Sequence, residues 1–115
     1  MAATPEKKVK KCITDQLKKL GAYYFCPMSG GFGKSGVPDI IVCFRGYFVA
    51  IEAKAGKNTT TELQERNLKE IREAGGIAVV VNESNMHNIT NLLQVLPEPE
   101  GHDGAGSWRY QVQPR

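Results

Sequence analysis

The sequence is poor in cysteine and histidine, which limits the metal and disulfide chemistry open to it. Its 115 residues include three cysteines and two histidines, and no two cysteines form a C-x-x-C pair. The odd number and the spacing argue against a zinc site and against a disulfide framework. Because each cysteine lies within an apolar pattern, we expect Cys12, Cys26 and Cys43 to be reduced residues of the core.

The chain also lacks a hydrophobic run long enough to cross a membrane. The segment from Met1 to Lys11 is polar and rich in lysine, without the apolar stretch of a secretory signal. We therefore expect a cytoplasmic protein that has neither a membrane partner nor an organic cofactor.

An excess of positive charge lies in the first 96 residues. The chain has a formal net charge of +3, and residues 97–115 carry three acids against two arginines, so residues 1–96 account for +4. This mild excess is compatible with nucleic-acid binding and is far from proving it. The length predicts one domain, 1–96, followed by a loosely attached tail, 97–115, that is rich in proline, glycine and charge. Within the tail, 108–112 is expected to add an edge strand or to pack on a partner.

The hydrophobic patterns predict an α/β domain with the order helix, three strands, helix, strand, helix. Thr4 and Pro5 indicate the N-cap and first residue of a helix that ends near Leu20. The later elements are a strand from Tyr23 to Met28, a hairpin, a helix that starts near Thr61 and ends before Gly75, a strand over Ile77–Val81 and a third helix capped by Ser84. The strand–helix–strand unit from Tyr47 to Val81 predicts a parallel crossover, and hence a small mixed sheet flanked by helices.

The central hairpin fixes which side chains face each other. The apolar runs 40–44 and 47–51 flank Arg45-Gly46, which favours a two-residue hairpin loop. With that loop, Ile40 pairs with Ile51, and the next pair outward places Asp39 opposite Glu52.

Two carboxylates that face each other across a strand ladder repel, unless a cation or a shared proton compensates. Side chains alternate between the two faces of a strand, so Lys54 shares the face of Glu52. Two acids and one ammonium therefore converge at the open end of the hairpin, an arrangement suited to holding a divalent cation beside a phosphate.

These residues also match a known pattern. Pro38-Asp39, an apolar strand and then Glu52-Ala53-Lys54 resemble the motif of the PD-(D/E)xK nuclease superfamily. The context from Ser35 to Ile40, with Gln64 downstream, is similar to the small phage-type VRR-NUC nucleases, and the resemblance runs from about Thr4 to Leu96.

The resemblance implies an αβββαβ core of the restriction-endonuclease type and a set of site residues. Mg²⁺ or Mn²⁺ would bind between Asp39 and Glu52, with the backbone carbonyl of Ala53 as a further ligand and Glu6 in support. Lys54 would neutralise charge on the phosphate or help to position the attacking water. The oxygen ligands favour these ions over zinc.

Two of the implied site residues have plain structural alternatives. Glu6 lies near a helix N-terminus and could pair with Lys10. Gln64 follows the family pattern, and it is also the last residue of a capping box that begins at Thr61.

Contacts to DNA are expected from the loops that flank the motif. Lys34 and Ser35 belong to a glycine-rich loop that could approach the DNA backbone or could simply be a flexible surface loop. Lys57 and Asn58 sit just after the motif and are better placed to contact DNA.

The sequence therefore predicts a metal-dependent DNA endonuclease. The resemblance implies selectivity for branched DNA, as in Holliday junction resolvases, a homodimer and a phage or prophage origin. The alternatives are a general nicking or double-strand nuclease, a non-catalytic DNA-binding module, and, least favoured, a metabolic enzyme acting on a small phosphate ester.

Overall fold

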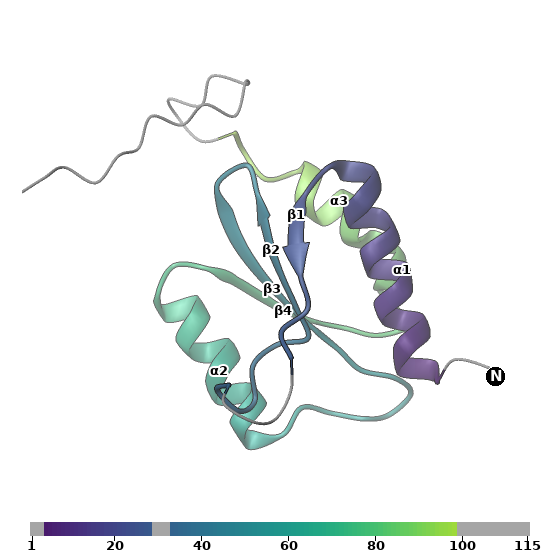
Figure 1. The fold of residues 1–115 in the computed structure, drawn as a ribbon, viewed down its shortest axis with the longest axis vertical. Helices are drawn as coiled ribbons and strands as arrows, with labels where there is room; N and C mark the ends of the chain where they lie inside the picture. Colours follow the sequence, from purple (N-terminus) through teal and green to yellow (C-terminus); the bar gives the residue numbers. More distant parts are fainter. Residues whose placement is uncertain (1–3, 29–32, 99–115) are drawn as a thin grey trace, which may run out of the picture.

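The computed structural model describes residues 4–28 and 33–98, and Figure 1 shows a four-stranded sheet with helices on both faces. The predicted α/β class and the small mixed sheet flanked by helices are confirmed. The elements are α1 (Pro5–Leu20), β1 (Tyr23–Phe25), β2 (Ile40–Phe44), β3 (Tyr47–Ala53), α2 (Glu62–Glu73), β4 (Ile77–Val81), the 3₁₀ helix η1 (Met86–Asn88) and α3 (Ile89–Gln94). Among these helices, none has the length and apolar character that a membrane span requires.

The sheet has the strand order β1-β2-β3-β4, and its register is the predicted one. β2 pairs antiparallel with β3, with Ile40 opposite Ile51 and Phe44 opposite Tyr47. Both residues of the loop have positive φ, 53° at Arg45 and 83° at Gly46, which matches the twist of a tight hairpin. β3 then pairs parallel with β4, as expected for a strand–helix–strand unit.

The helices divide the core into a large and a small part. One sheet face, with α1 and α3, buries a cluster that includes Ile13, Val42, Ile51 and Leu93. The other face buries a smaller cluster under α2, made by Ala50, Leu68 and Ala78. In Figure 1, α1 and α3 lie together on one side of the sheet and α2 lies on the other.

The ends of the first two helices follow from their capping residues. The Thr4 side chain accepts a hydrogen bond from the Lys7 N–H, Pro5 begins α1, and Gly21 ends it in the left-handed conformation. Thr61 caps α2 in the reciprocal arrangement of a capping box. Both helix positions were predicted from the sequence and are confirmed.

Three local expectations are wrong. β1 ends at Phe25 rather than at Met28. Cys26 and Cys43 are exposed rather than in the core. Cys26 lies beyond the end of β1, and Cys43 lies on the sheet face of which α2 covers the β3–β4 side. Ser84 does not cap the third helix: it donates to the Asn82 side chain in a polar turn, and α3 begins five residues later.

The tail falls mostly beyond the described residues. Of 97–115, the structure describes Pro97 and Glu98, so the predicted edge strand over 108–112 lies outside them. The division into a domain over 1–96 and a tail stays a prediction.

Gly36, just before the Val37-Pro38-Asp39 segment, gives a test of how tightly this segment is packed. Its φ is +75°, and an added Cβ would lie 2.6 Å from Leu63 Cγ and 2.9 Å from Asn67 Nδ2. We expect Gly36→Ala to lower the free energy of unfolding by about 3 kcal/mol, combining backbone strain with overpacking. Urea denaturation measures this.

The control is Gly56→Ala, because Gly56 has a similar φ of +61° and no heavy atom within 4 Å of the added Cβ. Its cost should be near 1 kcal/mol, from backbone strain alone. Equal costs at the two positions would contradict the tight packing of Gly36 against α2.

Candidate active site

Asp39 and Glu52 meet at the open end of the β2–β3 hairpin. Asp39 directly precedes β2 and Glu52 is the sixth residue of β3, one pair beyond the Ile40–Ile51 pair. The Ala53 N–H donates a hydrogen bond of 2.8 Å to Asp39 Oδ2. This bond carries the Asp39 side chain across to β3 and fixes its orientation beside Glu52.

Glu52 is a buried acid with incomplete hydrogen bonding. It is 2% exposed, and its Oε1 has no hydrogen-bond partner among the described residues. Its Oε2 lies 3.4 Å from Lys54 Nζ. An unpartnered buried carboxylate oxygen is costly, so this arrangement works against the stability of the fold.

The environment favours the protonated form of Glu52. Burial raises the pKa of its carboxyl group to about 7, and the charge of Asp39 adds to the effect, while Lys54 opposes it. A cation in addition to Lys54 would also offset the repulsion between the carboxyl groups of Asp39 and Glu52. The raised pKa of Glu52 thus reflects the repulsion between facing carboxylates that the hairpin register predicts.

Lys10 is a site residue that the sequence reasoning did not identify. Its Nζ lies 3.4 Å from Asp39 Oδ1, so the ion pair recorded for Lys10 is with Asp39 across the fold rather than with Glu6 along α1. A signal was present, because Lys10 is four residues from Glu6 and so lies on the same side of the helix. Whether Lys10 pairs with Glu6 or with Asp39 depends on how α1 packs against the sheet, and the sequence alone does not predict that packing.

Glu6 lies beside the site rather than within the acid pair. It is half-buried and borders a cavity of about 560 Å³ together with Gly56, Lys57, Asn58 and Glu83. Within residues 4–28 and 33–98, no three histidine, cysteine or acidic side chains gather closely enough to hold a metal ion. Asp39 and Glu52 therefore stand as a pair, with Glu6, Lys57 and Asn58 at a neighbouring cavity.

Gln64 takes the structural role that its sequence context offered. Its Oε1 accepts a hydrogen bond of 2.9 Å from the Thr61 N–H, and its own N–H donates to Thr61 Oγ1 at 3.1 Å. The side chain thereby caps α2. A role in the site stays a prediction.

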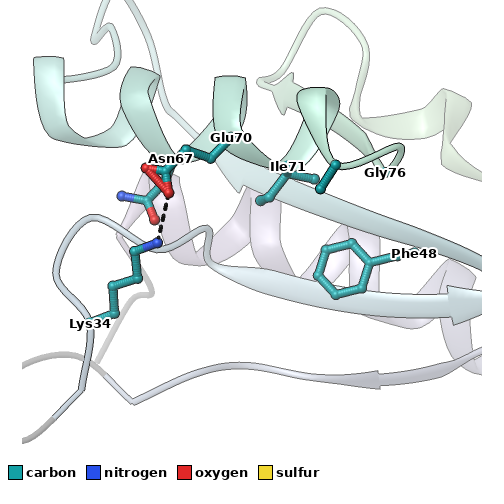
Figure 2. A pocket seen from close by; sticks show the side chains of 7 residues that line it. Lys34, Phe48, Asn67, Glu70, Ile71 and Gly76 are labelled. Carbon is teal, nitrogen blue, oxygen red and sulfur yellow. Dashed lines mark hydrogen bonds and ion pairs between the residues drawn. The ribbon is translucent and has the colours of Figure 1, made fainter.

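Lys34 and Ser35 lie on the α2 side of the sheet. Lys34 Nζ forms an ion pair of 3.0 Å with Glu70 Oε1, and the Ser35 carbonyl accepts from the Asn67 side chain. Figure 2 shows Lys34 and Glu70 at a cavity of about 300 Å³ whose other labelled walls include the ring of Phe48. The residues predicted to contact DNA thus form two groups, and Lys34 already has an anionic partner.

The donor set at the acid pair fits a hard divalent cation. The carboxyl groups of Asp39 and Glu52 lie side by side, and Glu52 Oε1 is buried without a hydrogen-bond partner among the described residues. No thiol or imidazole of the described residues belongs to this pair. Mg²⁺ is commonly bound by one or two carboxylates together with water and substrate oxygens, so a pair of acids is sufficient.

Together, the fold and the site define a small α/β domain that carries two acids and a lysine in the PD-(D/E)xK arrangement. No family profile matches the sequence, and no curated protein matches it. Solved structures do match the fold, and two of them illustrate the likeness. One, described as a "VRR_NUC domain protein", is 22% identical, covers 81% of this chain and 88% of its own, and has a TM-score of 0.63.

The second structure, described as a "VRR_NUC domain", is 26% identical with a TM-score of 0.62. The match covers 81% of this chain and 98% of that one. These likenesses show that the chain shares the fold of VRR-NUC domains, which is the fold that the resemblance in the sequence implies.

The raised pKa of Glu52 predicts a pH-dependent penalty in the metal-free protein. A folded pKa of about 7, above the ordinary 4.5, stabilises the fold at low pH, and this contribution is lost as the pH rises through 7. Between pH 5 and pH 8, Glu52→Gln should therefore gain about 2 kcal/mol of unfolding free energy relative to the wild type. Urea denaturation in EDTA measures the difference.

Glu73→Gln, at an exposed position of α2, is the matched control, because it also removes one carboxyl group but from the surface. A stability difference between Glu52→Gln and the wild type that stays constant from pH 5 to pH 8 would contradict the raised pKa of Glu52.

Proposed function

We propose that this protein is a metal-dependent endonuclease that hydrolyses phosphodiester bonds in DNA. The VRR-NUC likenesses support a nuclease of the PD-(D/E)xK type. The observation that carries the metal dependence is the buried Glu52 Oε1, which has no partner among the described residues and belongs to an acid directly beside Asp39. The ion would be Mg²⁺ or Mn²⁺, held by Asp39, Glu52 and the Ala53 carbonyl.

When bound, such a cation lowers the pKa of water and offsets the charge that develops on the phosphate. The chain's own residues fix the positions of the groups that would bind the ion. The Ala53 N–H orients the Asp39 carboxylate, and burial within the sheet fixes Glu52. Lys54, with a side chain that is 12% exposed, holds its ammonium beside Glu52, where it can stabilise the charged phosphate or position water.

The cavity bordered by Glu6 and by the segment that follows Lys54 supports the same function. Glu6, Lys57 and Asn58 border it, and the first and last of these are the kinds of side chain that bind water or a cation by oxygen. Lys57 supplies a positive charge for a phosphate. We include Glu6 as a supporting group for the ion on this basis.

The favoured substrate is branched DNA cut by a homodimer. A domain of this size contacts little DNA alone, and a two-fold dimer would offer two sites for paired cuts. This choice rests on the resemblance to junction-resolving VRR-NUC proteins. A general nuclease is the first alternative, and a DNA-binding module with structural acids is the second. An acid that only supported the fold would be expected to complete its hydrogen bonds, which speaks against the second.

The chemistry is tested by replacing each central residue without changing its shape greatly. We expect Asp39→Asn, Glu52→Gln and Lys54→Met each to lower the DNA cleavage rate by roughly 100-fold or more in Mg²⁺ or Mn²⁺. EDTA should abolish cleavage by the wild type. Gel assays with end-labelled DNA measure both effects.

Asp15→Asn is the control, because Asp15 is an α1 acid that pairs with Lys11 on the surface. It should cleave as the wild type does. Full cleavage by Glu52→Gln, or by the wild type in EDTA, would refute the metal-dependent mechanism. Binding without any cleavage would favour the DNA-binding module.

Substrate choice is tested separately with a four-way junction and a linear duplex of the same sequence. We expect metal-dependent, paired cuts near the branch point and little cutting of the duplex. Equal cutting of both would keep the nuclease chemistry and replace junction selectivity by general nuclease activity.

A further inference from the structure

We propose that Lys10 is a displaceable counter-cation of the metal site, which neutralises Asp39 while no divalent cation is bound and leaves when one binds. This inference rests on the proposed function. Beyond that function, the inference is that the divalent cation competes with Lys10 for Asp39, and that this competition sets the affinity for the metal.

The two oxygens of Asp39 have separate partners. Oδ2 accepts the hydrogen bond from the Ala53 N–H at 2.8 Å, whereas Oδ1 faces Lys10 Nζ at 3.4 Å. The backbone bond to Oδ2 would keep the carboxylate in place if Lys10 moved away. Oδ1 is thus the oxygen that can exchange one cation for another.

The contact of Lys10 is loose for an ion pair. Charge-assisted N–H···O hydrogen bonds are usually about 2.7–2.9 Å long, and the neighbouring pair of Lys11 with Asp15 on the same helix is 2.8 Å long. At 3.4 Å, Lys10 supplies charge without a tight bond to hold it.

The two lysines of the site differ in their freedom to leave. The Lys54 side chain is 12% exposed and sits beside the buried Glu52, whereas the Lys10 side chain is 36% exposed. Lys10 also has a flexible four-carbon stem that can carry its ammonium into water.

The charge count of the site supplies the driving force. Asp39 and Glu52, when both are ionised, are balanced by Lys10 and Lys54. A divalent cation added between the acids would leave an excess of positive charge, and repulsion would act on both ammonium groups. Both ion pairs are 3.4 Å long, so the more exposed lysine, Lys10, is expected to move.

The test is the affinity for Mn²⁺ of the full chain without DNA, measured by isothermal titration calorimetry. We expect Lys10→Met to bind Mn²⁺ about tenfold more tightly than the wild type, because the competing charge is gone. Lys10→Arg, which keeps the charge, should stay close to the wild type.

Lys11→Met is the matched control, since it removes one lysine from the adjacent position of α1 at a surface pair with Asp15. Its affinity should stay within about twofold of the wild type, which excludes an effect of net charge alone. Circular dichroism of each variant checks that α1 is intact.

The outcomes separate this inference from the proposed function. If the wild type binds Mn²⁺, Glu52→Gln does not, and Lys10→Met binds equally well or more weakly than the wild type, then the counter-cation role is wrong and the metal site stands. If the wild type binds no Mn²⁺, both the metal site and the role of Lys10 are refuted.

Discussion

The domain depends on holding two carboxyl groups face to face at the open end of one hairpin. Asp39 and Glu52 would repel each other there, and Glu52 is buried so that water cannot separate their charges. The hydrogen bond from the Ala53 N–H and the ion pairs of Lys10 and Lys54 keep the arrangement intact. The sheet, α1 and the core beneath them supply the rigid frame on which these contacts rest.

This arrangement lowers the stability of the fold at the candidate site. The unpartnered oxygen of Glu52 and the raised pKa of its carboxyl group are features that a purely structural position would avoid. Around the site, the helix ends and the turn follow the usual sequence preferences. Both long helices have capping residues, and both residues of the hairpin loop have positive φ. Departures from local consistency that concentrate at one place are typical of a functional site.

Most of the fold could be predicted because its determinants are local. The loop at Arg45-Gly46 fixes the register of β2 on β3, and with it the facing of Asp39 and Glu52. The caps at Thr4 and Thr61 fix where two helices begin. These signals depend on a few neighbouring residues and need no knowledge of the packing.

What could not be predicted depends on contacts between distant segments. To predict that Lys10 pairs with Asp39, one must know how α1 is placed against the sheet. The exposure of Cys43 requires knowing which part of a sheet face α2 covers. The place of Lys34 beside Glu70 requires the path of the glycine-rich loop, and the late start of α3 reflects a network of asparagine turns after β4.

The hairpin also separates the two ends of the described chain, with a practical consequence for engineering. Thr4 and Pro5 border the cavity that Glu6 and Lys57 line, whereas Glu98 forms an ion pair with Arg45 at the turn. The five residues of β2 separate these places, a span of roughly 17 Å. Figure 1 shows the start of α1 near the loop that follows β3, and the end of the described chain near the β2–β3 turn. A fluorescent reporter or purification handle fused directly before Thr4 would therefore lie close to the cavity that Glu6 and Lys57 border, whereas one fused directly after Glu98 would start near the β2–β3 turn.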